Sequence, residues 1–259
     1  IDPKNKNTLV DSIKLEYWAP VYWYYGGMEH TTLHLLYSRF WHKFLFDIGA
    51  VNTSEPYKKR TSHGLVLAEG GEKMSKSRGT VVNPDEFVKT YGADSLRLYE
   101  MFIGPFNQAV SWDSRGLIGP RRFIERVWAL GAKVSFDKDL KLGKESDFLL
   151  QKTIQKVTED IENTAFNTAI SSIMILSNAF EKEIKIPMMD FETFLKLLAP
   201  FAPHMTEELW RNLGNKKSIH ISEWPIADES KIVEDSITIV VQVNGKVRAS
   251  FQIAKNTGK

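Results

Sequence analysis

Hydrophobic and polar positions in the first hundred residues alternate in the manner of strands and helices. Val21–Tyr25 is β-branched and aromatic and ends at Gly26-Gly27, which predicts a buried strand. Across Glu29–Ile48 the apolar residues recur at helical spacing, and Gly49 is a typical stop after a helix. A short apolar run, Gly64–Ala68, predicts a second strand. This alternation predicts an α/β sheet with crossover connections, with strands enough for half of a doubly wound domain.

A glycine-flanked loop follows the second predicted strand. Gly70-Gly71 opens it, and Lys73–Gly79 (KMSKSRG) forms it. Asn83-Pro84-Asp85-Glu86 then predicts the start of a helix, because Asn is a preferred cap, Pro suits the first helical position and acidic residues favour the first turn.

Helical patterns dominate after Trp112. They cover roughly 114–134, 147–163, 165–184 and 190–213, which predicts a four-helix bundle. Phe166–Phe180 is apolar over much of its circumference and is expected at the centre. Ser218–Trp224 has short β character. At the end, Ile237–Val243 and Lys246–Ile253 flank Asn244-Gly245, which predicts a β-hairpin with a type I′ turn.

Composition excludes several classes of function. The 259 residues contain no cysteine, so a disulfide framework, a thiol nucleophile and a Cys-based zinc site are excluded, and a cytoplasmic location is expected. No apolar run reaches membrane-spanning length. The net charge is +2, so contacts with nucleic acid would need local patches, such as Lys58-Lys59-Arg60, Arg121-Arg122 and Lys216-Lys217.

The loop is the first candidate site. Loops at the carboxyl edge of a parallel sheet are where α/β proteins bind ligands. Lys73 and Lys76 are three residues apart, and ammonium groups there can meet the charge of a phosphoryl or nucleotidyl transition state. The hydroxyls of Ser75 and Ser77 add donors. An arbitrary Lys/Ser pentapeptide would be read as a solvated loop, so the interpretation depends on the flanking segments.

A second constellation follows the first strand. Glycine at Gly26-Gly27 lets the backbone approach a nucleotide closely, and the Glu29 carboxylate can accept hydrogen bonds from ribose hydroxyls. His30 and His34 have the i, i+4 spacing of one helix face, which by itself suggests a metal site. No third ligand is evident, so we predict no protein metal site. A structural role for His34 remains an alternative.

The flanking segments carry a family resemblance. Lys73–Ser77 resembles the signature loop of class I aminoacyl-tRNA synthetases, and Val81–Pro84 (VVNP) with Tyr91–Arg97 (YGADSLR) continues the match. Other segments resemble bacterial leucyl-tRNA synthetases specifically: Gly26–His30, Leu33–Tyr37, Arg39-Phe40, Phe123–Leu130, Phe166–Ile170 and Val241–Arg248. The resemblance covers nearly the whole chain.

The resemblance implies activation of leucine by ATP, usually with Mg²⁺, and transfer of leucine to tRNA(Leu). It places the loop residues Lys73, Met74, Ser75, Lys76 and Ser77 over the ATP phosphates, with Lys73 and Lys76 as the catalytic pair. Glu29 is expected on the ribose. His30 and His34 are expected near leucine and the adenylate. Leu65 and Val66 are expected to line the adenine site through their backbone. Arg121 and Arg122 would contact tRNA phosphates, although solvated helix residues are the simpler interpretation.

The implied fold is the second half of a Rossmann-like class I catalytic domain, then an antiparallel helix bundle of anticodon-binding type and a C-terminal β-hairpin. The expected ranges are 1–18 for a connection, 19–112 for the catalytic half, 113–217 for the bundle and 218–259 for the start of a further tRNA-binding domain.

The sequence also departs from the family pattern. No segment matches the family's other signature, a His-x-Gly-His type motif, and an editing domain is absent. We therefore expect a complementary N-terminal half, on the same full-length chain or a separate subunit, and an isolated chain that is inactive alone. A tRNA-binding or assembly module without catalysis is the main alternative. A synthetase for valine, isoleucine or methionine and an unrelated nucleotidyltransferase are weaker ones.

Overall fold

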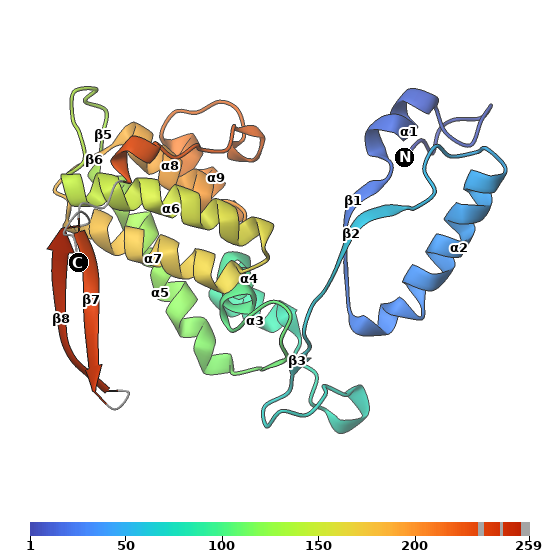
Figure 1. Cartoon of the computed structure of the whole chain (residues 1–259), viewed down its shortest axis with the longest axis horizontal. Coiled ribbons are helices and arrows are strands. Elements are labelled where there is room, and N and C mark those ends of the chain that lie inside the picture. Colours follow the sequence, from blue (N-terminus) through green and yellow to red (C-terminus); the bar gives the residue numbers. More distant parts are fainter. Residues whose placement is uncertain (233–235, 244–245, 255–259) are drawn as a thin grey trace. The chain divides into compact units, whose positions relative to one another are not determined.

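The computed structural model describes residues 1–232, 236–243 and 246–254 (Figure 1). The chain divides into two compact units. One, here called the sheet unit, comprises Ile1–Pro84 and Ile103–Arg115. The other, here called the helical unit, comprises Asp85–Phe102 and the chain from Gly116 onward. The helices that directly follow the loop Lys73–Gly79, here called the lysine loop, therefore belong to the helical unit.

The sheet unit begins with a crossover between parallel strands. Its elements are α1 (Ser12–Trp18), β1 (Val21–Gly26), the 3₁₀ turn η1 (Met28–Thr31), α2 (His34–Asp47) and β2 (Tyr57–Ser62). β1 pairs in parallel with β2, from Val21 opposite Tyr57 to Gly26 opposite Ser62. The first predicted strand is confirmed as a strand but not as a buried one, since Tyr22 in it is 70% exposed, and the glycine stop at Gly49, whose φ is +72°, is confirmed. The segment expected to be a plain connection contains α1, which Asp11 caps by accepting from two backbone N–H groups.

Two predictions for this part were wrong. The partner of β1 is β2, which the sequence analysis missed because Lys58-Lys59-Arg60 gives the strand a polar pattern. The long helix predicted across Glu29–Ile48 is interrupted: η1 ends at Thr31, and Leu33, with φ −112° and ψ −105°, separates it from α2. His30 and His34 therefore do not share one helix face.

The second part of the sheet unit carries the lysine loop. β3 (Val66–Leu67) is shorter than the predicted run and pairs in parallel with β4 (Val110–Ser111). Between them on the chain lies the 3₁₀ turn η2 (Lys76–Arg78). Just before β3, a Cβ at Gly64 would overlap the backbone of Gln108, so only glycine fits this close approach.

The helical unit consists mainly of α-helices. These are α3 (Pro84–Tyr91, its first residue in the sheet unit), α4 (Ala93–Phe102), α5 (Ile118–Leu130), α6 (Lys144–Glu162), α7 (Phe166–Lys182), α8 (Met188–Leu198) and α9 (Pro203–Asn212). Shorter elements are η3 (Ser114–Leu117, which begins in the sheet unit), η4 (Gly131–Lys133), η5 (Ile219–Ile221), η6 (Glu229–Lys231) and the parallel pair β5 (Val134–Ser135) and β6 (Ile186–Pro187). The predicted start of α3 after Asn83 is confirmed.

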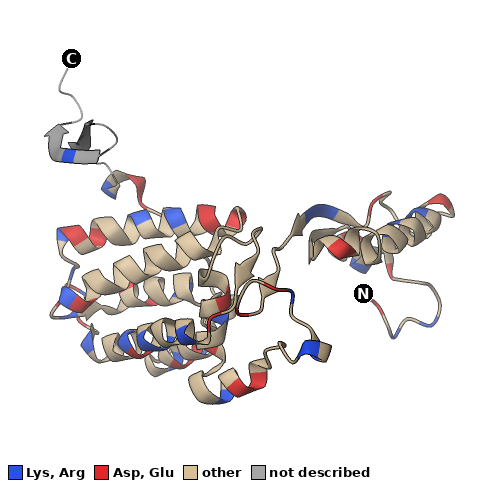
Figure 2. Cartoon of the chain, turned by 90° about the horizontal axis from the view of Figure 1, so that it is seen from below, with Lys and Arg blue, Asp and Glu red and all other residues tan. Residues whose placement is uncertain are grey.

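The hydrophobic core of the described chain lies in this unit. α7 is its central helix, as predicted, with Ile170, Ile173 and Leu176 fully buried. Phe180 packs against Phe194, with ring centroids 5.6 Å apart. Lys and Arg positions are interspersed with Asp and Glu positions along the helices of this unit (Figure 2). In the part of the chain that the structure describes, no helix is long and apolar enough to cross a membrane.

The end of the chain differs from the sequence prediction in two places. The single helix predicted at 190–213 is two helices, α8 and α9, because Pro203 occupies the first turn of α9 and cannot continue α8. The β character expected at 218–224 is the 3₁₀ turn η5, which Ser218 caps. β7 (Ser236–Val243) and β8 (Lys246–Ala254) pair antiparallel, and the predicted turn residues Asn244-Gly245 lie outside the described residues.

Candidate functional site

The lysine loop is held by its own backbone. After β3, the Ala68 N–H donates to the Glu72 carbonyl at 2.8 Å, and Gly70 and Gly71 take positive φ angles to make the turn. Lys73 then forms an isolated bridge with Leu67. At the other end, Thr80 closes η2: its N–H donates to the Ser75 carbonyl, and its hydroxyl accepts from the Ser75 N–H at 3.0 Å. The loop is thus a defined turn that presents its side chains outward.

The two lysines of the loop differ in surroundings. Lys73 and Lys76 are both exposed. Lys73 is near enough to Glu29 to act on its pKa. Arg78, by contrast, is paired with Glu72 at 2.8 Å. The hydroxyls of Ser75 and Ser77 lie 2.9 Å apart, and Met74 is half-buried. The loop therefore offers ammonium and hydroxyl donors to a ligand.

The turn after β1 carries the candidate carboxylate. Gly27 is buried, and a Cβ there would meet the Glu29 carboxylate. The pKa of Glu29 is held below its usual range, first because the carboxylate accepts from its own backbone N–H and then because His30, Lys73 and His63 are nearby positive or titratable groups. Partial desolvation opposes this. The lowered pKa keeps Glu29 an acceptor, as a ribose-binding role requires.

His34 has a structural partner. Its Nδ1 lies 2.9 Å from the Tyr24 hydroxyl, and the two rings stack with centroids 5.6 Å apart. Tyr37 contacts the same ring edge-on. The structural interpretation of His34 is therefore supported. His30 lies on η1 beside Glu29 and is exposed.

Leu65 precedes β3 and Val66 begins it, and β3 pairs in parallel with β4. The Leu65 carbonyl accepts from the Val110 N–H at 3.0 Å, and the Leu67 carbonyl accepts from the Trp112 N–H at 2.9 Å. Within the described chain β3 pairs with β4 along one edge, and its other edge carries the isolated bridge between Leu67 and Lys73. That Leu65 and Val66 line the adenine site through their backbone stays a prediction.

The structure adds His63, to which the sequence analysis assigned no role. It follows β2 directly, and its N–H donates to the Gly26 carbonyl at 3.4 Å. Because β1 and β2 are parallel, their carboxyl ends lie at one edge, where Gly26 and His63 lie, and His63 and Lys73 are near enough to Glu29 to lower its pKa. Recognising β2 as a strand would have revealed His63.

Arg121 and Arg122 lie on α5 in the helical unit. Arg121 is engaged: its Nε donates to Glu125 at 2.7 Å, and one Nη donates to the Tyr91 carbonyl at 3.2 Å, so it ties α5 to the end of α3. Arg122 is exposed. Of the pair, Arg122 is the side chain more available to a phosphate.

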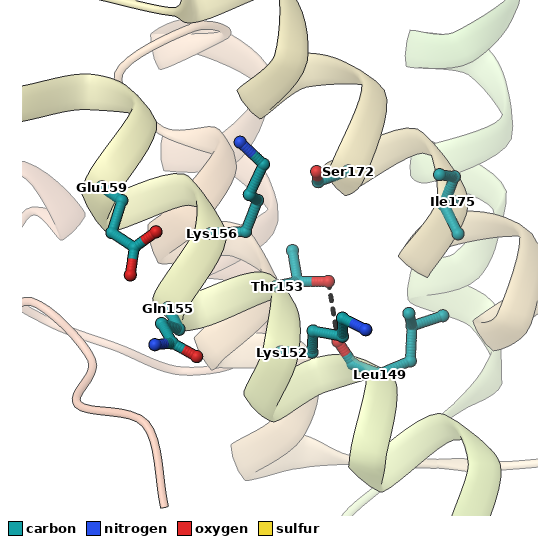
Figure 3. A pocket seen from close by; sticks show the side chains of 8 residues that line it. All are labelled: Leu149, Lys152, Thr153, Gln155, Lys156, Glu159, Ser172 and Ile175. Atoms are coloured by element: carbon teal, nitrogen blue, oxygen red, sulfur yellow. Dashed lines mark hydrogen bonds between the residues drawn. The ribbon is translucent and has the colours of Figure 1, made fainter. Parts of the chain in front are cut away.

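The helical unit also has a groove between α6 and α7, with a volume of about 330 Å³ (Figure 3). Its lining combines apolar side chains with two lysines one helical turn apart: Leu149, Lys152, Thr153, Gln155, Lys156, Glu159, Ser172 and Ile175. Lys156 pairs with the buried Asp160 at 2.5 Å. None of these residues was a predicted site residue, although the spacing of Lys152 and Lys156 on one helix face is visible in the sequence.

Comparisons with known proteins identify the families that two segments of the chain match. Residues 35–113 match the family of tRNA synthetases class I (I, L, M and V), and residues 148–259 match the anticodon-binding domain of tRNA ligase. Among solved structures, the agnB2 LeuRS of Agrobacterium radiobacter K84, in a ternary complex with tRNA and LeuAMS, matches with a TM-score of 0.80 and 33% identity over 96% of this chain.

A more distant structure shares the fold. Methionyl-tRNA synthetase of Mycobacterium tuberculosis, bound by methionyl-adenylate, matches with a TM-score of 0.56 and 18% identity over 77% of this chain and 45% of its own. The chain spans 34% of the length of the leucyl enzyme. Both family matches, their order and the near-complete coverage by the leucyl enzyme lead to one conclusion: the chain belongs to the leucyl-tRNA synthetase family of class I tRNA synthetases.

Proposed function

We propose that this chain supplies the lysine-loop half of the ATP site, and helices that contact tRNA, in a leucine–tRNA ligase. The observation that carries the proposal is the placement of Glu29 and His63 after two parallel strands, with Lys73 near enough to lower the pKa of Glu29 and with Lys76 exposed on the same loop as Lys73. That edge is the position at which α/β sheets bind nucleotides.

The proposed reaction has two steps. A leucine carboxylate oxygen attacks the α-phosphorus of ATP, the bond to pyrophosphate breaks, and leucyl-adenylate forms. A ribose hydroxyl at the tRNA end then attacks the leucyl carbonyl and releases AMP. Lys73 and Lys76 would stabilise the phosphate charge as pyrophosphate leaves. Glu29 would hold the ribose, and the Val66 backbone would meet adenine. The substrate carboxylate is the nucleophile, so the first step needs no general base.

Mg²⁺ would be bound by the triphosphate. The loop offers ammonium and hydroxyl donors, which suit phosphate oxygens, and its ammonium charges oppose the binding of a divalent cation. Within the described ranges, no group of three or more His, Asp or Glu could hold a metal ion. When bound, Mg²⁺ would neutralise phosphate charge, and the role of this chain is to supply the lysines beside it.

The sheet unit also supports a partner. Parallel sheets ordinarily have both faces covered. Here Tyr22 and Tyr25 on β1 are exposed, and α2 has no buried residue although it carries Phe40, which is 75% exposed, and Trp41. These side chains fit the surface of a complementary catalytic half, which we propose as the partner of the sheet unit.

The helical unit supports a tRNA partner. Residues 148–259 match a domain described as anticodon-binding, and the leucyl relative was solved with tRNA. Arg122 on α5 and Lys152 at the α6–α7 groove are exposed cations on this unit. We propose that they contact tRNA phosphates, which attract arginine and lysine irrespective of base sequence.

The test is leucine-dependent ATP–pyrophosphate exchange by the chain alone and with the complementary half. We expect exchange only when the two halves are mixed. Lys76→Ala should lower this exchange by roughly a hundredfold, because one phosphate-stabilising cation is lost. Lys89→Ala, which removes an exposed lysine on α3, is the matched control and should leave exchange unchanged. Exchange by the chain alone would contradict the half-site proposal. A folded pair with no exchange that still binds tRNA would favour a non-catalytic tRNA-binding module.

A further inference from the structure

We infer that Arg60 is a positioning residue for the nucleotide and leucine sites, acting through η1. This inference rests on the proposed function, because it concerns the two residues of η1, Glu29 and His30, that are proposed to meet the substrates. η1 is a single 3₁₀ turn between β1 and α2. Such a short turn has few internal bonds, so its pose depends on what its neighbours supply.

The neighbour is β2, which bonds to both ends of η1. An Arg60 Nη donates to the Thr31 hydroxyl at 2.9 Å, at the end of the turn. The same Nη lies 3.9 Å from the Met28 sulfur, and the Ser62 hydroxyl lies 3.0 Å from that sulfur, at the start of the turn. Glu29 and His30 lie between these two anchored positions. Arg60 and Ser62 therefore hold the segment that carries both proposed contacts.

The position of the Arg60 side chain leaves one of its donors in an unfavourable environment. Its Nε is buried and has no hydrogen-bond partner in the described part of the chain. A buried guanidinium donor without a partner is unfavourable, so its presence needs a compensating role. The two lysines beside Arg60 on β2 have other partners, since Lys58 and Lys59 lie over the rings of Tyr22 and Trp23.

The residues at the strand edge therefore have two different roles, one electrostatic and one geometric. Arg60 does not belong to the groups that lower the pKa of Glu29, which are its own N–H, His30, Lys73 and His63. Its effect is geometric, through Thr31. Loss of the Arg60–Thr31 bond would let η1 move relative to Lys73, and substrates would be held less well at both Glu29 and His30 because catalysis is sensitive to small misplacements.

The experiment compares Arg60→Ala, Thr31→Val and the double variant in the paired enzyme, with ATP and leucine varied separately. We expect each single change to lower kcat/KM by roughly tenfold through a higher KM for both substrates, because one charge-assisted bond is lost. The double variant should be no worse than the poorer single variant, since both remove the same bond. Arg60→Lys should recover part of the loss, and Lys89→Ala, which removes an exposed lysine on α3, should have no effect.

A second readout does not depend on activity. Arg60→Ala should speed amide hydrogen exchange at residues 28–31 in the chain itself, and Lys58→Ala should not. Unchanged exchange at η1, or additive kinetic losses in the double variant, would overturn the inference. A wild-type pair that is inactive, with η1 loosened by Arg60→Ala, would instead overturn the proposed function and leave the geometric role of Arg60 standing.

Discussion

The two units of this chain differ in how far their large hydrophobic side chains are buried. In the helical unit, large apolar side chains such as Phe180, Phe191 and Phe194 are fully buried. In the sheet unit, the buried hydrophobic residues of the described chain are Ala68 and Trp112, while Phe40, Trp41 and other aromatic residues remain exposed. Both units have well-formed secondary structure, so the difference lies in packing.

The difference shows where the free energy of folding comes from in each unit. A buried core stabilises the helical unit from within, since each large side chain removed from water contributes roughly 1.5–3 kcal/mol. The sheet unit has the strands, crossover helix and ion pairs of an α/β fold without the apolar burial that stabilises one. We therefore expect the helical unit to be stable alone and the sheet unit to gain its stability from a partner.

The largest expected effect is a cavity in the helical core. Phe194→Ala removes a fully buried ring that packs on Phe180, and should cost about 3–5 kcal/mol of unfolding free energy. Phe40→Ala is the matched change in the sheet unit and should cost well under ~1 kcal/mol in the chain alone. Urea unfolding followed by circular dichroism measures both. Equal losses would break the comparison.

The second effect concerns the partner surface. Phe40→Asp places a charge on the exposed face of α2 and should leave the stability of the chain alone nearly unchanged. It should weaken assembly with the complementary half by about 2–4 kcal/mol, as expected for an aromatic residue at the centre of an interface. Binding measured by calorimetry, with Ile184→Asp on the helical unit as an exposed control, decides this. Undiminished binding would contradict the proposed docking face.

The third effect tests what joins α4 to the bundle. Asp94 in the first turn of α4 is buried and accepts from the Met205 N–H at 2.7 Å and the His204 N–H at 3.3 Å, at the start of α9. Asp94→Ala should cost about 1–2 kcal/mol because two N–H groups of α9 lose their acceptor. Asp94→Asn keeps an acceptor and should cost less. Thermal unfolding measures the loss of stability in each variant. Equal losses in Asp94→Ala and Asp94→Asn would show that the Asp94 side chain does not cap α9.

Sequence patterns predicted the parts of the fold that local chemistry determines. β1, the start of α3 at Pro84 and the burial of α7 follow from residue types and periodicity alone. β2 could not be predicted in this way, because its residues are polar and charged. The charge of Lys59 is accommodated in the strand by the Trp23 ring, whose centre lies 3.7 Å from the lysine Nζ. That contact exists only once β1 and β2 are paired.

The candidate site was predictable to a similar extent. The motif residues Glu29, Lys73 and Lys76 were identified from the sequence. That Glu29 and Lys73 share the edge with His63 required the register of β1 with β2. The role of His34 was undecided because nothing in the pattern of α2 shows that its ring meets Tyr24. Long-range pairing determined each of these points.

The smallest effect is electrostatic and lies on the sheet unit. Arg39 and Lys43 on α2 bond to Glu55 at 2.6 and 2.9 Å and lower its pKa to about 2, from an ordinary value of 4.5. Because the folded-state pKa is depressed, this stabilisation is complete above pH 4.5 and is lost as the pH falls toward 2. The pair is partly exposed, so solvent screening limits its contribution to a fraction of ~1 kcal/mol. NMR titration of Glu55 in the chain and in Arg39→Ala measures it. A pKa that stays near 2 in the variant would show that Arg39 is not its main cause. A return toward 4.5 would show that the ion pair with Arg39 is the main cause of the lowered pKa.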